Sequence, residues 1–328
     1  MSHVPKAVLY HFPSSIWCSV VLLALEEKGY APDEIDLRIV DISKGENYDP
    51  SFLRLNRKAT VPTLVVPLEN SLAEDEQSRY KALNSTRAIV DLLDKSRSAH
   101  SRTNTTSQAP APSLSPATVS FSSTTNQLLD LLHSPEADPN NFTFFSATDD
   151  ASLDKVAQTA APFLAAQRDT LVKLLADDQL KVSDNVKNFW REKKAARDTL
   201  LGFYTDSSTP TSSLSEEAKK TREEYFTMCK SARAAIKEIL EKVTAEIIGP
   251  YVLGDQISIV DLHFAAWLTR ILLSAGVGAK DEGAAAVNEL EKFLGSEFTA
   301  EQKSKLATVW ESFKGRESWK KVYKDGLH

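Results

Sequence analysis

Two residues near the N-terminus, Ser15 and Cys18, have the types and the spacing of a thiol-binding site. They lie in the segment FPSSIWC, between an apolar run at residues 7–11 and a stretch of helical periodicity at residues 15–28. Backbone N–H groups at a helix start are unpaired and favour an anion. Ser15 can therefore cap the helix or donate its hydroxyl to a bound thiolate, and the sequence leaves both roles open. Cys18 is expected to be a packed thiol, because the leading position of a Cys-x-x-Cys redox motif is serine here.

A second candidate is the Val61–Pro62 pair, which begins an apolar run at residues 61–66. Proline removes a donor from the hydrogen bonding of a strand. A cis Val61–Pro62 bond would turn the backbone N–H and C=O of Val61 toward an open site, where they could pair with an extended peptide ligand. A proline in an ordinary edge strand explains the pair equally well.

A third candidate is the pair of adjacent hydroxyls at Ser85 and Thr86, where a strand ends and a helix begins. Such a helix start accepts anions and would suit the carboxylate of a ligand. An ordinary Ser/Thr cap is the alternative.

The spacing of Ser258 and Asp261 is that of a capping box, with Asp in place of the usual Glu or Gln. We interpret this motif as structural: it begins a helix that runs through Trp267. His263 follows the box and is expected to be a structural hydrogen-bonding residue rather than a base.

The first 95 residues alternate between strand and helix patterns. Strands are predicted at residues 7–11, 35–40, 61–66 and 80–83, and helices at 15–28, at 50–55 and from 85 onward. This alternation predicts an α/β domain that would position the three candidate segments.

Residues 96–125 are rich in Ser, Thr and Pro. Such a composition buries little apolar surface, so we expect a linker or mobile loop there. From residue 126 to residue 328 the apolar spacing is helical, and it is clearest in the long stretch that begins at Ser215.

Composition excludes several classes of protein. The chain has 328 residues, 42% of them hydrophobic, and a formal net charge of -6. That charge argues against a nucleic-acid binder and against adhesion to anionic membranes. The longest apolar stretch, residues 262–277, is interrupted by Arg270 and is too short to span a bilayer. Two cysteines form neither a disulfide framework nor a cysteine-rich zinc site, and no signal-peptide pattern is present, so we expect no metal and a cytoplasmic location.

Taken together and in this order, these features resemble the glutathione transferase superfamily. Four segments carry the resemblance: VLYHFPSSIWCSVVLLALEEKGY, LNRKATVPTLVVP, STRAIVDLLD and YVLGDQISIVDLHFAAW. The resemblance implies a thioredoxin-like α/β N-terminal domain followed by an all-α helical C-terminal domain. The corresponding division is residues 1–95 for glutathione binding, 96–125 as the linker, and 126–328 for binding a second substrate.

The resemblance also assigns roles to individual residues. Ser15 matches the serine whose side chain meets the glutathione sulfur. Val61 matches the residue whose backbone pairs with the cysteinyl part of glutathione, and Pro62 matches the cis-proline. Ser85 and Thr86 match the acidic-Ser pair that holds the γ-glutamyl end.

Several positions depart from the family pattern. The usual acidic residue is Ser85, the usual glycine is Ala59, and Thr60 stands where Lys or Gln is common. Lys58 or Arg54 is the candidate to bind the glycine carboxylate of glutathione in place of the residue usual at position 60.

The implied activity is conjugation of the glutathione thiolate to an apolar electrophile, in detoxification or secondary metabolism. The candidate walls of the electrophile pocket are Phe12, Trp17 and Phe142, with Phe144 and Phe145 beside the last. The family is usually dimeric, so a homodimer is expected. The alternatives are a non-catalytic glutathione-binding or regulatory protein on the same fold, or a glutathione-dependent peroxidase.

Overall fold

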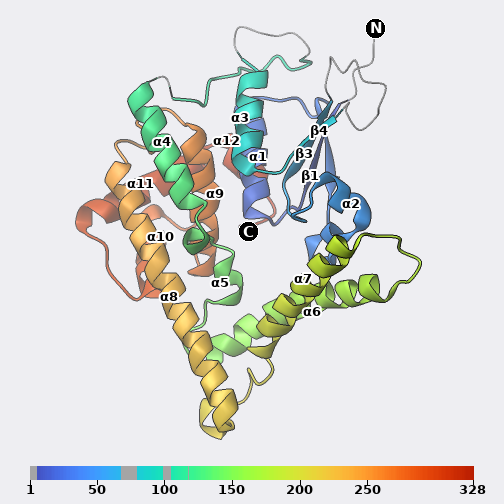
Figure 1. The fold of residues 1–328 in the computed structure, drawn as a ribbon. Helices are drawn as coiled ribbons and strands as arrows, with labels where there is room; N and C mark the ends of the chain where they lie inside the picture. Colours follow the sequence, from blue (N-terminus) through green and yellow to red (C-terminus); the bar gives the residue numbers. More distant parts are fainter. Residues whose placement is uncertain (1–5, 68–79, 99–104, 117) are drawn as a thin grey trace. The chain divides into compact units, whose positions relative to one another are not determined.

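The computed structural model describes residues 6–67, 80–98, 105–116 and 118–328 (Figure 1). The contacts of the chain group it into two compact units. The first comprises residues 1–39, 60–138 and 237–328, and the second comprises residues 40–59 and 139–236. The division predicted at residues 95 and 125 stays a prediction.

Four short strands of the first unit form one mixed sheet in the order β2–β1–β3–β4. They are β1 (Ala7–His11), β2 (Ile35–Ile39), β3 (Thr63–Pro67) and β4 (Tyr80–Leu83). β1 and β2 run parallel, joined through α1 (Ile16–Glu27), because parallel neighbours need a crossover connection. With α3 (Thr86–Ser96) packed against α1, the unit contains a thioredoxin-like α/β domain, which confirms the predicted fold class.

The register of the sheet brings three separate chain segments to one edge. β3 is antiparallel to β1, with Tyr10 opposite Thr63, and antiparallel to β4, with Leu64 opposite Leu83. The end of β1, the start of β3 and the end of β4 therefore lie side by side. β3 begins at Thr63 rather than at residue 61, since Pro62 has no N–H to donate to a neighbouring strand.

The rest of the first unit is mainly helical, as predicted for the C-terminal part. Its helices are α4 (Val119–Leu132), the last part of α8 (Glu216–Glu246), α9 (Ile259–Ser274), α10 (Gly283–Leu294), α11 (Ala300–Gly315) and α12 (Glu317–Val322), with a 3-10 turn, η4 (Pro135–Ala137). α9 is buried along almost its whole length and packs against α1, α4 and α10. Of the helices in the described part of the chain, none combines the length and apolarity needed to cross a bilayer.

The start of α9 depends on Asp261, as the capping-box spacing predicted. One carboxylate oxygen accepts the backbone N–H of Val252 at 2.7 Å. The other accepts the backbone N–H of Ser258 at 2.8 Å and its hydroxyl at 2.6 Å. Asp261 is fully buried, so these groups have no access to water and depend on the carboxylate.

A buried ion pair ties the C-terminal end of α1 to α3. The Lys28 ammonium donates to the Asp94 carboxylate at 2.8 Å, and the two side chains are only 1% and 4% exposed. The same ammonium donates to the carbonyl of Pro112 at 2.6 Å, while the Asp94 carboxylate accepts the N–H groups of Leu114 and Ser115. The pair therefore also holds the chain at residues 112–115.

Part of the segment predicted as a linker or mobile loop, residues 96–125, makes defined contacts within the first unit. Arg97 donates to the carbonyls of Ala109 and Pro110 at 2.9 and 3.1 Å, and Leu114 is 1% exposed. α4 begins at Val119, inside the same segment. Residues 99–104 and 117 lie outside the described residues. The partners of residues 105–116 include charged side chains at the C-terminal ends of α1 and α3, which the composition of the segment itself does not reveal.

Gly29 permits the close approach of this segment. Its φ of +64° lies in the left-handed region, and a Cβ built there would come within 2.7 Å of the Pro110 carbonyl. A glycine is therefore required by both the backbone conformation and the space.

The second unit is built around two long helices. Its elements are η1 (Ile42–Lys44), η2 (Glu46–Tyr48), α2 (Pro50–Leu55), α5 (Asn141–Phe144), α6 (Asp150–Ala176), α7 (Asp184–Gly202), η5 (Thr211–Ser213) and the first part of α8 (Glu216–Glu246). The indole N–H of Trp190 on α7 donates to the carbonyl of Tyr48 at 3.1 Å, and Gln167 on α6 donates to the carbonyl of Ile42 at 2.6 Å. These bonds hold residues 42–48 against α6 and α7.

Replacing Asp261 by Ala is expected to lower the free energy of unfolding by about 3 kcal/mol, because two buried N–H groups lose their acceptor. Chemical denaturation followed by circular dichroism measures the change. Glu301→Ala removes an exposed carboxylate from the first turn of α11 and is the control, with an expected loss below about 0.5 kcal/mol. Equal losses in both variants would contradict this account of the capping box.

Burial acts to raise the pKa of Asp94, but hydrogen bonds from Lys28, Ser115 and the Leu114 N–H outweigh it and hold the pKa below its ordinary value. A lowered folded-state pKa stabilises the fold above the unfolded-state pKa of about 4, and this contribution is lost as the pH falls through the folded-state value. Asp94→Asn should therefore reduce stability at neutral pH and flatten its dependence on pH below about 4. Denaturation midpoints between neutral and acidic pH test this, and parallel pH curves for variant and wild type would refute it.

Candidate active site

Ser15 lies at the start of α1, immediately beyond the sheet edge where β1 ends. It is the N-cap residue, with extended backbone, and its Oγ accepts the backbone N–H of Cys18 at 3.4 Å. Its carbonyl accepts the N–H of Ser19 at 2.9 Å, which is the first hydrogen bond of the helix. The side chain is half-buried. The capping role left open by the sequence is thus present, and a weak cap of 3.4 Å leaves the hydroxyl able to turn toward a stronger acceptor.

Cys18 is a packed thiol, as predicted. Its side chain is fully buried, and its sulfur accepts the backbone N–H of Phe12 at 3.5 Å. Burial raises the pKa of the Cys18 thiol to about 11, although hydrogen bonds from Ser15 and from the Phe12 N–H act to lower it. The thiol is therefore protonated at neutral pH and is not a nucleophile.

The other two candidate segments of the first unit lie at the same sheet edge as Ser15. The Val61–Pro62 bond is cis, as the family resemblance implied, and Thr63 next to it pairs with Tyr10 near the end of β1. Ser85 is the N-cap residue of α3; its side chain is exposed and makes no capping hydrogen bond. The next residue, Thr86, is buried.

Lys58 and Ala59 belong to the second unit. Lys58 is exposed. Ala59 has a φ of +54°, a conformation that favours glycine, and its carbonyl accepts the Asn47 side-chain amide at 2.8 Å. The backbone therefore explains why glycine is the usual residue at this position of the family pattern.

Of the predicted pocket walls, Phe12 and Trp17 lie in the first unit and are half-buried, whereas Phe142 lies in the second unit and is 2% exposed. Trp17 stacks on His133, the C-cap residue of α4, with ring centroids 4.1 Å apart. His133 in turn shares a hydrogen bond of 2.8 Å with His263 on α9, the structural role predicted for His263.

Both histidines are neutral at physiological pH. Burial, followed by the charge of Arg87, lowers the pKa of His133 to about 4, and burial lowers that of His263 as well. The pair therefore contributes hydrogen bonding beside Trp17 but no positive charge.

One face of α9 reaches the first turn of α1. The guanidinium of Arg270 donates to the carbonyl of Ser14 at 2.8 Å, and Trp267 donates to the carbonyl of Ala137 at 2.6 Å. Sequence reasoning missed Arg270 and His133 as neighbours of the site. The available signal for Arg270 was a single charge inside an apolar stretch, whereas nothing near His133 in the sequence points to α1.

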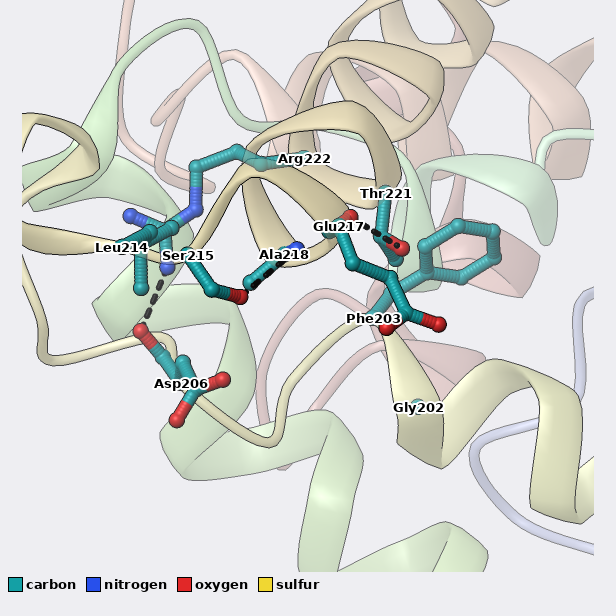
Figure 2. Close-up of a pocket in the computed structure, with 9 residues that line it drawn as sticks. All are labelled: Gly202, Phe203, Asp206, Leu214, Ser215, Glu217, Ala218, Thr221 and Arg222. Carbon is teal, nitrogen blue, oxygen red and sulfur yellow. Dashed lines mark hydrogen bonds between the residues drawn. The ribbon is translucent and has the colours of Figure 1, made fainter.

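The second unit contains a polar pocket of about 210 Å³ at the turn between α7 and α8 (Figure 2). Arg222 donates to the carbonyl of Asp206 across it, and the Ala218 N–H donates to Ser215 Oγ at 3.3 Å. Arg222 also pairs with Asp150, so its charge is already balanced within the unit. None of the predicted site residues lines this pocket. Among the residues that the structure describes, no group of three or more acidic, histidine or cysteine side chains is arranged to hold a metal ion.

The part of the chain that contains the candidate segments of the first unit is similar to a known protein family. Residues 9–101 match the family model of the glutathione S-transferase N-terminal domain. A tetrachloro-p-hydroquinone reductive dehalogenase of Sphingobium chlorophenolicum is 44% identical over 64 residues, which are 19% of this chain and 25% of that protein. The chain thus matches about a quarter of the length of this relative.

Two crystal structures share the fold. A glutathione transferase family member from Pseudomonas fluorescens pf-5, with two glutathione bound, is 13% identical and has a TM-score of 0.52 over 98% of this chain and 94% of that one. A glutathione transferase from Burkholderia graminis, with two glutathione molecules bound per subunit, is 15% identical and has a TM-score of 0.51 over 98% and 89%. The matched residues contain the β1–α1 turn, the cis-proline and the start of α3, so the part of the chain at residues 9–101 is a glutathione S-transferase N-terminal domain.

Proposed function

We propose that this protein is a glutathione transferase that conjugates the thiolate of glutathione to an apolar electrophile, with Ser15 stabilising the thiolate. The observation that carries the proposal is the position of the Ser15 hydroxyl. It lies at the start of α1, at the sheet edge that also presents Val61–Pro62 and the Ser85–Thr86 helix start.

The physical problem for the enzyme is ionisation of the thiol. A free thiol has a pKa near 8.5, so only a few per cent is thiolate at neutral pH. Lowering that pKa by about two units requires about 2.7 kcal/mol of preferential stabilisation of the anion. A charge-assisted hydrogen bond from Ser15 and the positive end of the α1 dipole together would contribute a stabilisation free energy of this order. A thiolate accepts the Ser15 hydroxyl more strongly than the neutral Cys18 thiol does, so the hydroxyl would turn toward it.

The remaining parts of glutathione have candidate partners. The backbone N–H and C=O of Val61 would pair with the cysteinyl part, and the exposed hydroxyl of Ser85, with the start of α3, would hold the γ-glutamyl carboxylate. Lys58, an exposed cation, would bind the glycine carboxylate, with Arg54 as the other candidate.

In the reaction, the sulfur of glutathione forms a bond to an electrophilic carbon, the leaving group departs with its bonding electrons, and the thiol proton has already passed to solvent. The name of the relative from Sphingobium suggests a halogenated aromatic ring as the electrophile to test first. Phe12 and Trp17 are the candidate walls nearest the start of α1, and Phe142 is the candidate from the second unit. We further propose a cytoplasmic homodimer that acts in detoxification.

A second function is favoured by one observation. The first turn of α3 carries no acidic residue, so the usual partner for the ammonium group of glutathione is missing at Ser85. That loss would suit a non-catalytic glutathione-binding or regulatory protein on the same fold. A glutathione-dependent peroxidase would need no protein cysteine and would use the same thiolate.

Ser15→Ala is expected to lower kcat/KM at least tenfold on a chromogenic aryl halide, while the affinity for glutathione changes less, because the lost hydrogen bond is strongest to the ionised sulfur. Ser14→Ala removes the neighbouring exposed hydroxyl and is the matched control. Unchanged turnover in Ser15→Ala would refute the role of Ser15.

Binding and turnover by the wild type separate the two functions. Retention on immobilised glutathione together with turnover supports the transferase. Retention without turnover on a panel that includes tetrachloro-p-hydroquinone supports the regulatory protein, and failure of retention excludes both.

Both cysteines are expected to resist alkylation by iodoacetamide in the native protein at neutral pH, because burial raises the pKa of Cys18 and of Cys229. Mass spectrometry before and after denaturation measures the labelling. Rapid native labelling of Cys18, together with a disulfide-reductase activity that Cys18→Ser abolishes, would favour thiol redox chemistry instead.

A further inference from the structure

Arg270 is a charged residue inside the most buried helix of the first unit. Every residue of α9 from Ile259 to Leu272 is buried except Arg270, which is half-buried. Its guanidinium reaches the residue before Ser15, the N-cap of α1. Its Nη2 donates to the carbonyl of Ser14 at 2.8 Å, and this carbonyl belongs to the peptide bond between Ser14 and Ser15. The side chain of Arg270 is half-buried, and this burial lowers the pKa of its guanidinium.

Several titratable groups lie near Arg270, and most of them are neutral at neutral pH. The negative charge of Asp138, the C-cap residue of η4, acts to raise the pKa of Arg270. Tyr323, after α12, is neutral because burial raises its pKa to about 12, and burial likewise lowers the pKa of His328. On α1, the Cys18 thiol is neutral as well. Of these groups, Asp138 is the one that carries a charge opposite to that of Arg270 at neutral pH.

Holding a backbone carbonyl does not require a charge. A neutral amide such as glutamine donates a comparable hydrogen bond, and removing a guanidinium from water costs free energy. A half-buried charge, however, is screened by water less than a fully exposed one and therefore acts more on other charges nearby. The first turn of α1, Ile16 to Cys18, has no charged side chain of its own. Arg270 is thus the cation that reaches the residue next to Ser15.

We propose that Arg270 is a positioning residue for the reaction: it holds the Ser14 carbonyl and its positive charge favours the ionised form of the glutathione sulfur at Ser15. Asp138 opposes this effect and limits its size. The inference rests on the proposed function, because it assigns the charge that supports the thiolate.

The test is a pH titration of the thiolate absorbance of bound glutathione, with the pH profile of kcat/KM on an aryl halide as a second readout. Arg270→Gln keeps a donor for the Ser14 carbonyl but removes the charge, and it should raise the pKa of the bound thiol by about one unit. Activity at neutral pH should then fall by up to about tenfold and recover at higher pH. Arg270→Lys keeps the charge and should shift the pKa less, and Asp138→Asn should shift it in the opposite direction.

Arg316→Gln is the matched control. It removes a guanidinium that pairs with Glu27 at the far end of α1, roughly 18 Å along the helix and beyond the screening length of about 8 Å at physiological salt. This variant should leave the thiol pKa unchanged. The fold of each variant is checked by its melting temperature, and Asp138→Asn gives an independent reading if Arg270→Gln does not fold.

The outcomes separate the two proposals. A lowered thiol pKa in the wild type that is the same in Arg270→Gln, or equal shifts in Arg270→Gln and Arg270→Lys, overturns the role of the Arg270 charge and leaves the proposed function intact. A bound thiol that titrates as in free glutathione in the wild type overturns both.

Discussion

The first unit depends on the buried ion pair between Lys28 and Asp94. It joins the C-terminal end of α1 to α3, and through Pro112, Leu114 and Ser115 it also orders a stretch of chain whose composition is that of a linker. Each charge is nearly inaccessible to water, and the cost of burying it is offset because both carboxylate oxygens accept hydrogen bonds and the ammonium donates two. The direction of α1, and with it the position of its first turn, follows from this connection.

The other end of α1 is held by weaker and more polar contacts. Ser15 caps the helix at a long distance, and Arg270 donates to the carbonyl of the residue before it. A helix start that is positioned from outside, rather than by a strong cap, leaves its N–H groups and its serine hydroxyl available to a ligand. The antiparallel register then adds the cis-proline and the start of α3 at the same edge.

Within the second unit, the conformation of Ala59 shows how a departure from the family pattern is accommodated. The left-handed backbone is kept although the residue is not glycine, and the amide of Asn47 holds its carbonyl. At Ser85 the departure is chemical instead, because the backbone geometry of the helix start is retained while the carboxylate is gone. Both departures lie within residues 9–101, the part of the chain that matches the glutathione S-transferase N-terminal domain.

The sequence by itself determined the local elements and the local chemistry. Periodicity located the strands and most helices, and the spacings placed Ser15 at a helix start, Asp261 in a capping box and Cys18 as a packed thiol. These features depend on residues close in the chain, where spacing translates directly into geometry.

Only the tertiary structure decided the order at residues 105–116, the start of β3 at Thr63 and the approach of Arg270 and His133 to the first turn of α1. Their partners are distant in the chain: 256 residues separate Arg270 from Ser14. No local pattern encodes such a pairing, because it arises from the packing of α9 against α1 and from burial that makes an unpaired charge or carbonyl costly.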